Sequence, residues 1–457
     1  MKRLFLVEPV VALYSLANIA VYLLVQQYIY IRIWERETNS SYVANGNHSQ
    51  CYQNHSDPVY VKQQVAQGLS SQYFMYMSLI QFIPGLVVTF FLGAYSDRYG
   101  RRLSLLLPTI GSLISSLAFL AVSYFSWSIY FLFIPVAFVA FLGGFTTLFG
   151  GAFAYVADMS SSKQKNMRMA LLDMIVGVMG GIGVLASGYF LKAVGFNWPF
   201  LTISLINFAN IVYIIFFLEE SVQVSRNEQD QVSGCENFRE ILSGILILYT
   251  SSDFTKRVQI SMLLLAFTTF GLAEFGAAGL FTLYELNTPL CWNEILIGYG
   301  SATGLIPFLL SFVGVTLFSR YLQDTFIVLI GILSFVGGMI LAIFATTTLL
   351  MFLVRLVSLF AVMPFPILRS MMSKSVLPKD QGALFACIAC LENLSGTVSA
   401  AIFNSVYAAT VEKFTGFSFL LAACLCFIPV CILCFLLWWK PQEDDYTKLI
   451  TNEDCSS

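Results

Sequence analysis

The chain has 457 residues, of which 58% are hydrophobic and only 11% are Asp, Glu, Lys or Arg. A water-soluble domain is about half apolar and about a quarter charged, so this composition excludes a soluble globular protein. The net charge of −2 and the lack of a basic run give no indication of a nucleic-acid partner. The sequence therefore predicts an integral protein of the lipid bilayer.

Long apolar runs follow one another along the chain and predict membrane-spanning helices. A helix needs about 20 apolar residues to cross the hydrocarbon core, and barrel strands would instead alternate apolar and polar residues over about ten positions. The runs here are continuous. We expect twelve spans, at 5–31, 70–94, 103–124, 128–156, 168–192, 197–218, 258–286, 293–319, 325–347, 349–371, 383–410 and 416–439.

A polar stretch over 219–257 separates the first six spans from the last six. We therefore predict an all-α fold of two six-helix bundles. The N-terminal bundle occupies 1–218 and the C-terminal bundle 258–440, with 219–257 as a cytosolic linker and 441–457 as a cytosolic tail. Rocking of two such bundles about a central cavity is a common transporter architecture.

The distribution of Lys and Arg predicts the orientation in the membrane. Most of the 24 basic residues fall in the loops on the side of the two termini, so the positive-inside rule places both termini in the cytosol. The loop over 32–69 would then face the lumen. It carries three Asn-x-Ser sequons, which are modified only on that side, and we expect glycosylation at Asn39, Asn47 and Asn54.

A motif between the second and third spans combines a glycine with Asp-Arg-Tyr-Gly-Arg-Arg, and it resembles the loop signature of the major facilitator superfamily. Its aspartate is expected to meet the positive end of a neighbouring helix and to pair with a basic residue, as in a latch between two rocking states. An ordinary basic turn is the alternative. The matching segment 319–324 of the second half has lost the pattern. The predicted latch comprises Gly93, Asp97, Arg98, Gly100, Arg101 and Arg102.

Ionisable residues inside spans are costly to bury and are usually functional. We predict that Asp173, Glu274 and Glu392 exchange the coupling proton, and that Arg369 and Arg355 attract the anionic end of a substrate. A permanent structural ion pair between Asp173 and Arg369 is the alternative. Both histidines lie in the sequon loop, so a proton path inside the membrane would rest on carboxylates.

Further residues are predicted to line the cavity or to join the halves. Tyr14, Asn18 and Tyr284 are candidates for the cavity wall. Cys51 and Cys291 are the only cysteines expected on the lumenal side, where an oxidising compartment favours a disulfide.

The remaining cysteines lie mostly inside spans, where such residues usually act as small apolar groups. The pair Cys387 and Cys390 could alternatively suit Cu(I), which leaves a copper carrier open as a second reading. The sequence contains no nucleophile–base pair, Walker loop or zinc signature, so we expect no enzyme and no cofactor beyond the coupled proton. A non-transporting receptor or scaffold is a third reading.

The tail combines two short sorting signals of the type that clathrin-associated adaptors bind. Asp445 with Leu449 and Ile450 fits an acidic dileucine signal, and Tyr446 begins a tyrosine signal. These patterns predict delivery to endolysosomal membranes, with the plasma membrane as a second location.

Two segments, 283–302 and 379–386, are similar to solute carrier family 46 over Leu-Tyr-Glu-Leu-Asn-Thr-Pro-Leu-Cys-Trp-Asn-Glu and Lys-Asp-Gln-Gly-Ala-Leu-Phe-Ala. The resemblance is closest to the lysosomal branch. It implies proton-driven export of amphipathic organic anions, steroid conjugates and bile acids, from lysosome to cytosol. It also implies passage of muramyl peptides and a link to copper.

The same resemblance implies roles for single residues. The aspartate of the family's basic loop matches Asp97, its acidic residue early in the fifth span matches Asp173, and its arginine late in the tenth span matches Arg369. The lumenal cysteine bridge of the family matches Cys51 and Cys291. One position departs from the family: the folate-transporting member has a histidine where this chain has Glu274. This argues against folate as the main substrate.

Overall fold

The computed structural model describes residues 6–38, 58–221, 254–286, 290, 292, 296, 299–300, 303–376, 381–410 and 414–439. Several predicted features lie outside these residues. They are the sequons at Asn39, Asn47 and Asn54, the cysteines Cys51 and Cys291, most of the linker over 219–257, the side chain of Arg98, and the sorting residues Asp445, Tyr446, Leu449 and Ile450.

The first half consists of apolar helices, and those from α2 to α7 follow one another with short connections. Its helices are α1 (Glu8–Thr38), α2 (Pro58–Tyr99), α3 (Arg102–Tyr124), α4 (Phe133–Phe141), α5 (Gly144–Met159), α6 (Ser162–Val194) and α7 (Asn197–Phe216), with a short 3₁₀ turn η2 (Ile129–Leu132) before α4.

The second half repeats this pattern with more interruptions. Its helices are α9 (Phe254–Leu286), α11 (Ile306–Phe318), α12 (Asp324–Ile343), α13 (Thr348–Val357), α14 (Pro364–Lys374), α15 (Gln381–Thr410), α16 (Phe417–Leu425) and α17 (Phe427–Trp439). The described residues contain no strand.

Ten of the helical segments are long and apolar enough to cross a membrane, and Ile306–Phe318 and Thr348–Val357 are shorter apolar helices. The prediction of an all-helical, twelve-span membrane protein is therefore confirmed. Three spans are each built from two helices, and the breaks have physical causes. Gly143 separates α4 from α5 with a positive φ of 91°, a conformation that favours glycine. Pro364 begins α14, because proline suits the first turn of a helix but cannot continue one.

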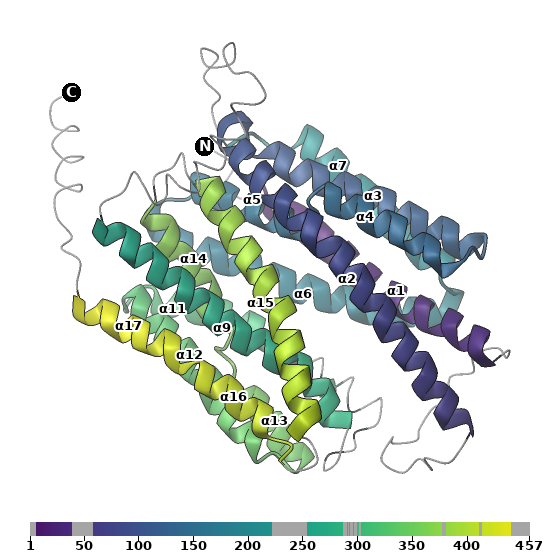
Figure 1. Cartoon of the computed structure of the whole chain (residues 1–457). Helices are drawn as coiled ribbons and strands as arrows, with labels where there is room; N and C mark the ends of the chain where they lie inside the picture. Colours follow the sequence, from purple (N-terminus) through teal and green to yellow (C-terminus); the bar gives the residue numbers. More distant parts are fainter. Residues whose placement is uncertain are drawn as a thin grey trace.

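The two halves contact each other through two sets of helices. α15 packs against α2 and α5, and α6 packs against α11 and α14 (Figure 1). Glycines permit this approach: a Cβ on Gly93 would lie 2.4 Å from the Cβ of Ala386, and a Cβ on Gly177 would lie 2.3 Å from the ring of Phe308. Small residues of this kind are typical of close helix packing in membranes.

We define the basic end as the end of the molecule where α2 ends at Tyr99, α6 begins at Ser162 and α14 ends at Lys374. α2 and α15 contact each other near this end and diverge away from it (Figure 1). At the far part of these two helices, Ser78 and Ala400 both line a cavity. The halves therefore meet at the basic end and separate toward the opposite end.

Candidate functional site

A cavity of about 860 Å³ lies between the halves. Its wall combines α2, α5 and α6 of the first half with α9 and α11–α15 of the second half. Most of the wall is apolar, and it includes seven phenylalanines: Phe145, Phe149, Phe275, Phe281, Phe308, Phe335 and Phe365. The ionisable groups of the wall are three carboxylates, Asp173, Glu274 and Glu392, and two arginines, Arg355 and Arg369.

Arg369, on α14, joins two carboxylates of different helices. Its Nη1 donates to Oδ1 and Oδ2 of Asp173 on α6 at 2.9 and 2.8 Å, and its Nη2 donates to Oε2 of Glu392 on α15 at 2.5 Å. The arginine side chain is 3% exposed, whereas that of Glu392 is 31% exposed. One buried positive charge therefore faces two carboxylates, and Glu392 is the partner that is more accessible from the cavity.

Aromatic rings hold the guanidinium of Arg369 in place. Its Cζ lies 4.3 Å from the centre of the Phe153 ring and 5.4 Å from that of Phe267. Cation–π contacts at these distances are attractive and restrict the side chain to one orientation. From the sequence, an ion pair between Asp173 and Arg369 was predicted only as an alternative. Glu392 was predicted as a separate proton-exchanging residue and not as a partner of Arg369.

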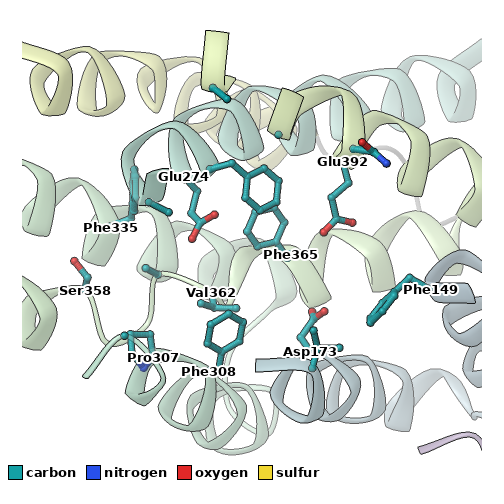
Figure 2. A pocket seen from close by; sticks show the side chains of 18 of the residues that line it. Phe149, Asp173, Glu274, Pro307, Phe308, Phe335, Ser358, Val362, Phe365 and Glu392 are labelled. Atoms are coloured by element: carbon teal, nitrogen blue, oxygen red, sulfur yellow. The ribbon is translucent and has the colours of Figure 1, made fainter. Parts of the chain in front are cut away.

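Glu274, on α9, also lines the cavity but stands apart from this group. Figure 2 shows its carboxylate on one side of Phe365, with Asp173 and Glu392 on the other side. No ion pair or side-chain hydrogen bond joins Glu274 to any of the described residues. Because an unpaired charge is costly to bury, a carboxyl in this setting can be neutralised by a proton.

Arg355, in the last turn of α13, is the second cation of the wall. Its Nη2 lies 3.3 Å from Oε1 of Glu285, and its Cζ lies 3.9 Å from the centre of the Phe281 ring. The side chain of Arg355 is 20% exposed and that of Glu285 is 2% exposed. The arginine is therefore the member of this pair that faces the cavity.

The three weaker candidates for the wall lie outside the cavity lining. The hydroxyl of Tyr14 accepts from the hydroxyl of Ser112 at 3.4 Å, and the amide of Asn18 donates to the Ser112 hydroxyl at 3.3 Å. The hydroxyl of Tyr284 donates to the carbonyl oxygen of Ala345 at 3.1 Å. These polar groups are used in helix packing, so we assign none of the three to substrate contact in this conformation.

The motif between α2 and α3 makes the contacts that its sequence predicts. Asp97 accepts hydrogen bonds from the backbone N–H of Gly382 at 2.7 Å and of Ala383 at 2.9 Å, both in the first turn of α15. It also pairs with Arg101, which in turn pairs with Asp158 of α5 at 2.8 Å. Burial alone would lower the pKa of Arg101, but the two carboxylates raise it. An ionised Asp97 at this helix N-terminus joins the two halves.

Gly100, Arg101 and Arg102 of the motif are contacted by α7 and by Glu220, which follows it. The carboxylate of Glu220 accepts from the backbone N–H of Arg101 at 2.6 Å and of Arg102 at 3.2 Å. The guanidinium of Arg102 donates to the carbonyl oxygen of Ile214 at 2.9 Å. Gly100 has a φ of 111°, and a Cβ at this position would lie 2.4 Å from the Glu220 carboxylate. The loop is therefore fixed within the first half.

A second polar contact between the halves was not found from the sequence. Asn166 of α6 donates to Oδ1 of Asp324 at 2.6 Å, and its side-chain oxygen accepts from Ser370 at 2.5 Å and from Lys374 at 2.9 Å. Lys374 also pairs with Asp324 at 2.7 Å. We call these four residues the Asn166 cluster. It joins α6 to α12 and α14 at the basic end.

The sequence did contain a signal for this cluster. Counted from Ile83-Pro84 in the first half and Ile306-Pro307 in the second, Asp324 stands at the position that Arg101 holds in the first half. The first half pairs Arg101 with Asp158, and the second half pairs Asp324 with Lys374. Each half therefore has a charged residue at this position that forms an ion pair, with the sign of its charge exchanged.

Within the residues that the structure describes, no group of three or more His, Cys, Asp or Glu side chains could hold a metal ion. Cys387 and Cys390 are free thiols. These residues therefore give no support to a copper site.

Comparisons with known proteins agree with this architecture. The Major Facilitator Superfamily profile matches residues 56–400. The lysosomal proton-coupled steroid conjugate and bile acid symporter SLC46A3 of Gallus gallus is 47% identical over 455 residues, which cover 99% of this chain and 98% of the relative. The same protein of Homo sapiens is 39% identical, covering 99% and 98%. The proton-coupled folate transporter of Rattus norvegicus is 35% identical, covering 95% and 93%.

Solved structures share the fold at low sequence identity. The crystal structure of the human organic anion transporter MFSD10 has a TM-score of 0.73 at 16% identity, covering 95% of this chain and 100% of that one. The E. coli fucose:proton symporter FucP has a TM-score of 0.64 at 11% identity, covering 94% and 97%. The full-length relatives and the fold make this protein a membrane transporter and not an enzyme. The chain belongs to the major facilitator superfamily and, within it, to solute carrier family 46.

Proposed function

We propose that this chain is a lysosomal proton-coupled transporter that exports amphipathic organic anions, chiefly steroid conjugates and bile acids, from the lumen to the cytosol. The observation that carries the proposal is the position of Arg369, which is shared between two carboxylates in the wall of an aromatic cavity between the halves. The printed names of the full-length relatives, lysosomal proton-coupled symporters of steroid conjugates and bile acids, support the same substrate class.

The size and lining of the cavity suit an amphipathic anion. Its volume of about 860 Å³ lies within the usual range of small-molecule pockets, about 300–1,000 Å³. The seven phenylalanines offer a broad apolar surface for a fused-ring body. The two arginines of the wall would receive a sulfate or carboxylate group.

The charge balance around Arg369 provides the coupling. An incoming anion must compete with Asp173 and Glu392 for the same guanidinium, and it would bring a further negative charge next to both. A proton on Glu392, the more exposed of the two carboxyls, would remove one competitor and release Nη2 for the substrate. Anion and proton would then occupy the site together.

Glu274 is proposed as a second proton acceptor in the same cavity. It has no partner among the described residues, and it lies across Phe365 from the Arg369 group (Figure 2). A negative charge there would repel an anionic substrate, so its neutralisation would favour occupancy of the cavity.

Alternating access is proposed to depend on the contacts at the basic end. Asp97 and the Asn166 cluster both join the halves there. Their release would let the halves rock apart at the basic end and close at the opposite end.

We assign the basic end to the cytosol and the loop over 32–69 to the lysosomal lumen, with delivery by adaptors that bind the tail. Removal of N-glycans should shift the electrophoretic mobility of the wild-type chain but not of a variant with Asn39, Asn47 and Asn54 replaced by Gln. Non-reducing electrophoresis should detect the proposed bridge between Cys51 and Cys291 as a mobility change that either Cys→Ser variant abolishes.

Uptake of a labelled steroid sulfate into proteoliposomes tests the proposed function. Uptake should rise when the outside is acidic relative to the interior, and a protonophore that collapses the gradient should remove the increase. Inhibition by a muramyl dipeptide would extend the substrate class to muramyl peptides. Reconstituted protein that shows no uptake under any gradient would favour the receptor or scaffold reading instead.

A further inference from the structure

The two arginines of the cavity differ in how many of their donors are already used. Arg369 makes three hydrogen bonds to two carboxylates and is 3% exposed. Among the residues that the structure describes, Arg355 makes one hydrogen bond, to Glu285, at 3.3 Å. Charge-assisted bonds of this kind are usually about 2.7–2.9 Å long. The cation that a new anion can reach without displacing a strong partner is therefore Arg355.

The surroundings of Arg355 hold its guanidinium ready for such a ligand. Phe281 covers one face of the group, with the Cζ of Arg355 3.9 Å from the centre of the ring. Its counter-ion, Glu285, is 2% exposed and accepts from Nη2 alone among the described hydrogen bonds of Arg355. The side chain of Arg355 is 20% exposed, so an anion in the cavity could accept from the part of the guanidinium that Glu285 does not use.

Arg355 and Arg369 lie at different depths along the tenth span. Trp292 donates to Thr348 at the start of α13, and Arg355 lies in the last turn of that helix. Arg369 follows on α14, close to Lys374 at the basic end. Because the halves contact each other at the basic end, a substrate that comes from the opposite end reaches the level of Arg355 before that of Arg369.

We propose that Arg355 is an outer anion subsite, which holds the sulfate or carboxylate group of the substrate while Arg369 is still bound to Asp173 and Glu392. Binding at this subsite needs no proton. Protonation near Arg369 then allows the anionic group to move inward, or allows a second anionic group of the same substrate to bind there. This inference rests on the proposed function and assigns the first step of substrate recognition.

Equilibrium binding separates this step from transport. Purified full-length protein in nanodiscs is titrated with a labelled steroid sulfate at neutral pH, and separately with the uncharged parent steroid. Arg355→Gln should weaken binding of the sulfate by about tenfold or more, the loss expected for a hydrogen-bonded charge. It should change binding of the parent steroid by less than twofold. A damaged cavity would weaken both ligands equally, and that result would overturn the proposal.

Two further variants test the sign and the specificity. Glu285→Gln removes the competing carboxylate and should strengthen sulfate binding several-fold at neutral pH. Arg32→Gln is a matched control, since Arg32 is an exposed arginine that lies outside the cavity lining. It should bind as the wild type does.

The outcomes also distinguish this inference from the proposed function. If Arg355→Gln binds the sulfate within twofold of the wild type, or if Glu285→Gln binds it less tightly, the outer subsite is refuted even when uptake is intact. If the wild type shows no gradient-driven uptake, the proposed function fails, and the binding titrations still decide whether Arg355 holds the anion.

Discussion

Replacing Asp97 with alanine should open the basic end of the transporter. The carboxylate accepts two backbone hydrogen bonds from the first turn of α15, at 2.7 and 2.9 Å, and these bonds cross between the halves. A hydrogen bond to a charged group is worth about 1.5–3 kcal/mol, and its favourable position at a helix N-terminus adds about 0.3–1 kcal/mol. Water would solvate the groups that the mutation frees and would offset part of this loss. The free energy of the closed state relative to the open state should therefore rise by about 3 kcal/mol.

A loss of this size should be directly measurable as a change in populations. Each 1.4 kcal/mol corresponds to a tenfold change in an equilibrium constant, so the ratio of closed to open molecules should fall on the order of a hundredfold. Spin labels at Ser161 and Tyr321, exposed positions of the two halves at the basic end, would report the change as a longer distance distribution in pulsed electron resonance.

Asp158→Ala is the matched control for this experiment. Asp158 pairs with Arg101 at 2.8 Å and Asp97 pairs with it at 2.6 Å, and both pairs lie within the first half. Asp97 additionally accepts the two backbone hydrogen bonds from α15 of the second half. Loss of Asp158 should lower the thermal stability of the protein with a much smaller change in the label distance. If both variants shift the distances equally, or if Asp97→Ala shifts nothing, the latch interpretation is wrong.

Three further variants test the coupling and the closed contact. Asp173→Asn should abolish the stimulation of uptake by an acidic exterior while the protein stays folded, and a preserved pH profile would count against its role in coupling. Asn166→Leu removes three hydrogen bonds between the halves and should open the basic end by about as much as loss of Asp97, measured with the same labels. Gly93→Val should also favour the open state, because even a Cβ there lies 2.4 Å from Ala386; an unchanged distance distribution would refute the tight contact.

Continuous apolar runs made the helical fold predictable, because each span must satisfy its own backbone hydrogen bonds in lipid. The interruptions within spans were not predicted. Pro364 and Gly143 are visible in the sequence, but a proline or glycine in a membrane helix is tolerated when neighbouring helices satisfy the freed groups. The break between α13 and α14 matters for the site, since it separates Arg355 from Arg369 along one span.

Charged residues inside spans were predicted as functional because their burial is costly, and all five line the cavity: Asp173, Glu274, Arg355, Arg369 and Glu392. Their partners were less predictable. Nothing in the sequence shows that Arg369 contacts Glu392 as well as Asp173, since that depends on how α6, α14 and α15 pack. The tyrosine candidates lie outside the cavity lining in this conformation, and a related reason applies: a buried hydroxyl takes whichever partner the packing offers, as Tyr284 does with Ala345.

Arg369 combines two carboxylate partners with a place in the cavity wall, and this combination favours a coupling site over a structural ion pair. Arg101 also pairs with two carboxylates, Asp97 and Asp158, but it lies outside the cavity lining. Arg369 has two, so the fully ionised group carries a net negative charge beside an apolar cavity. An anionic substrate cannot be stable there until a proton has cancelled part of that charge. On the proposed function, the same imbalance that makes the empty site receptive to a proton would make substrate binding dependent on one, and the charges around Arg369 would then account for symport.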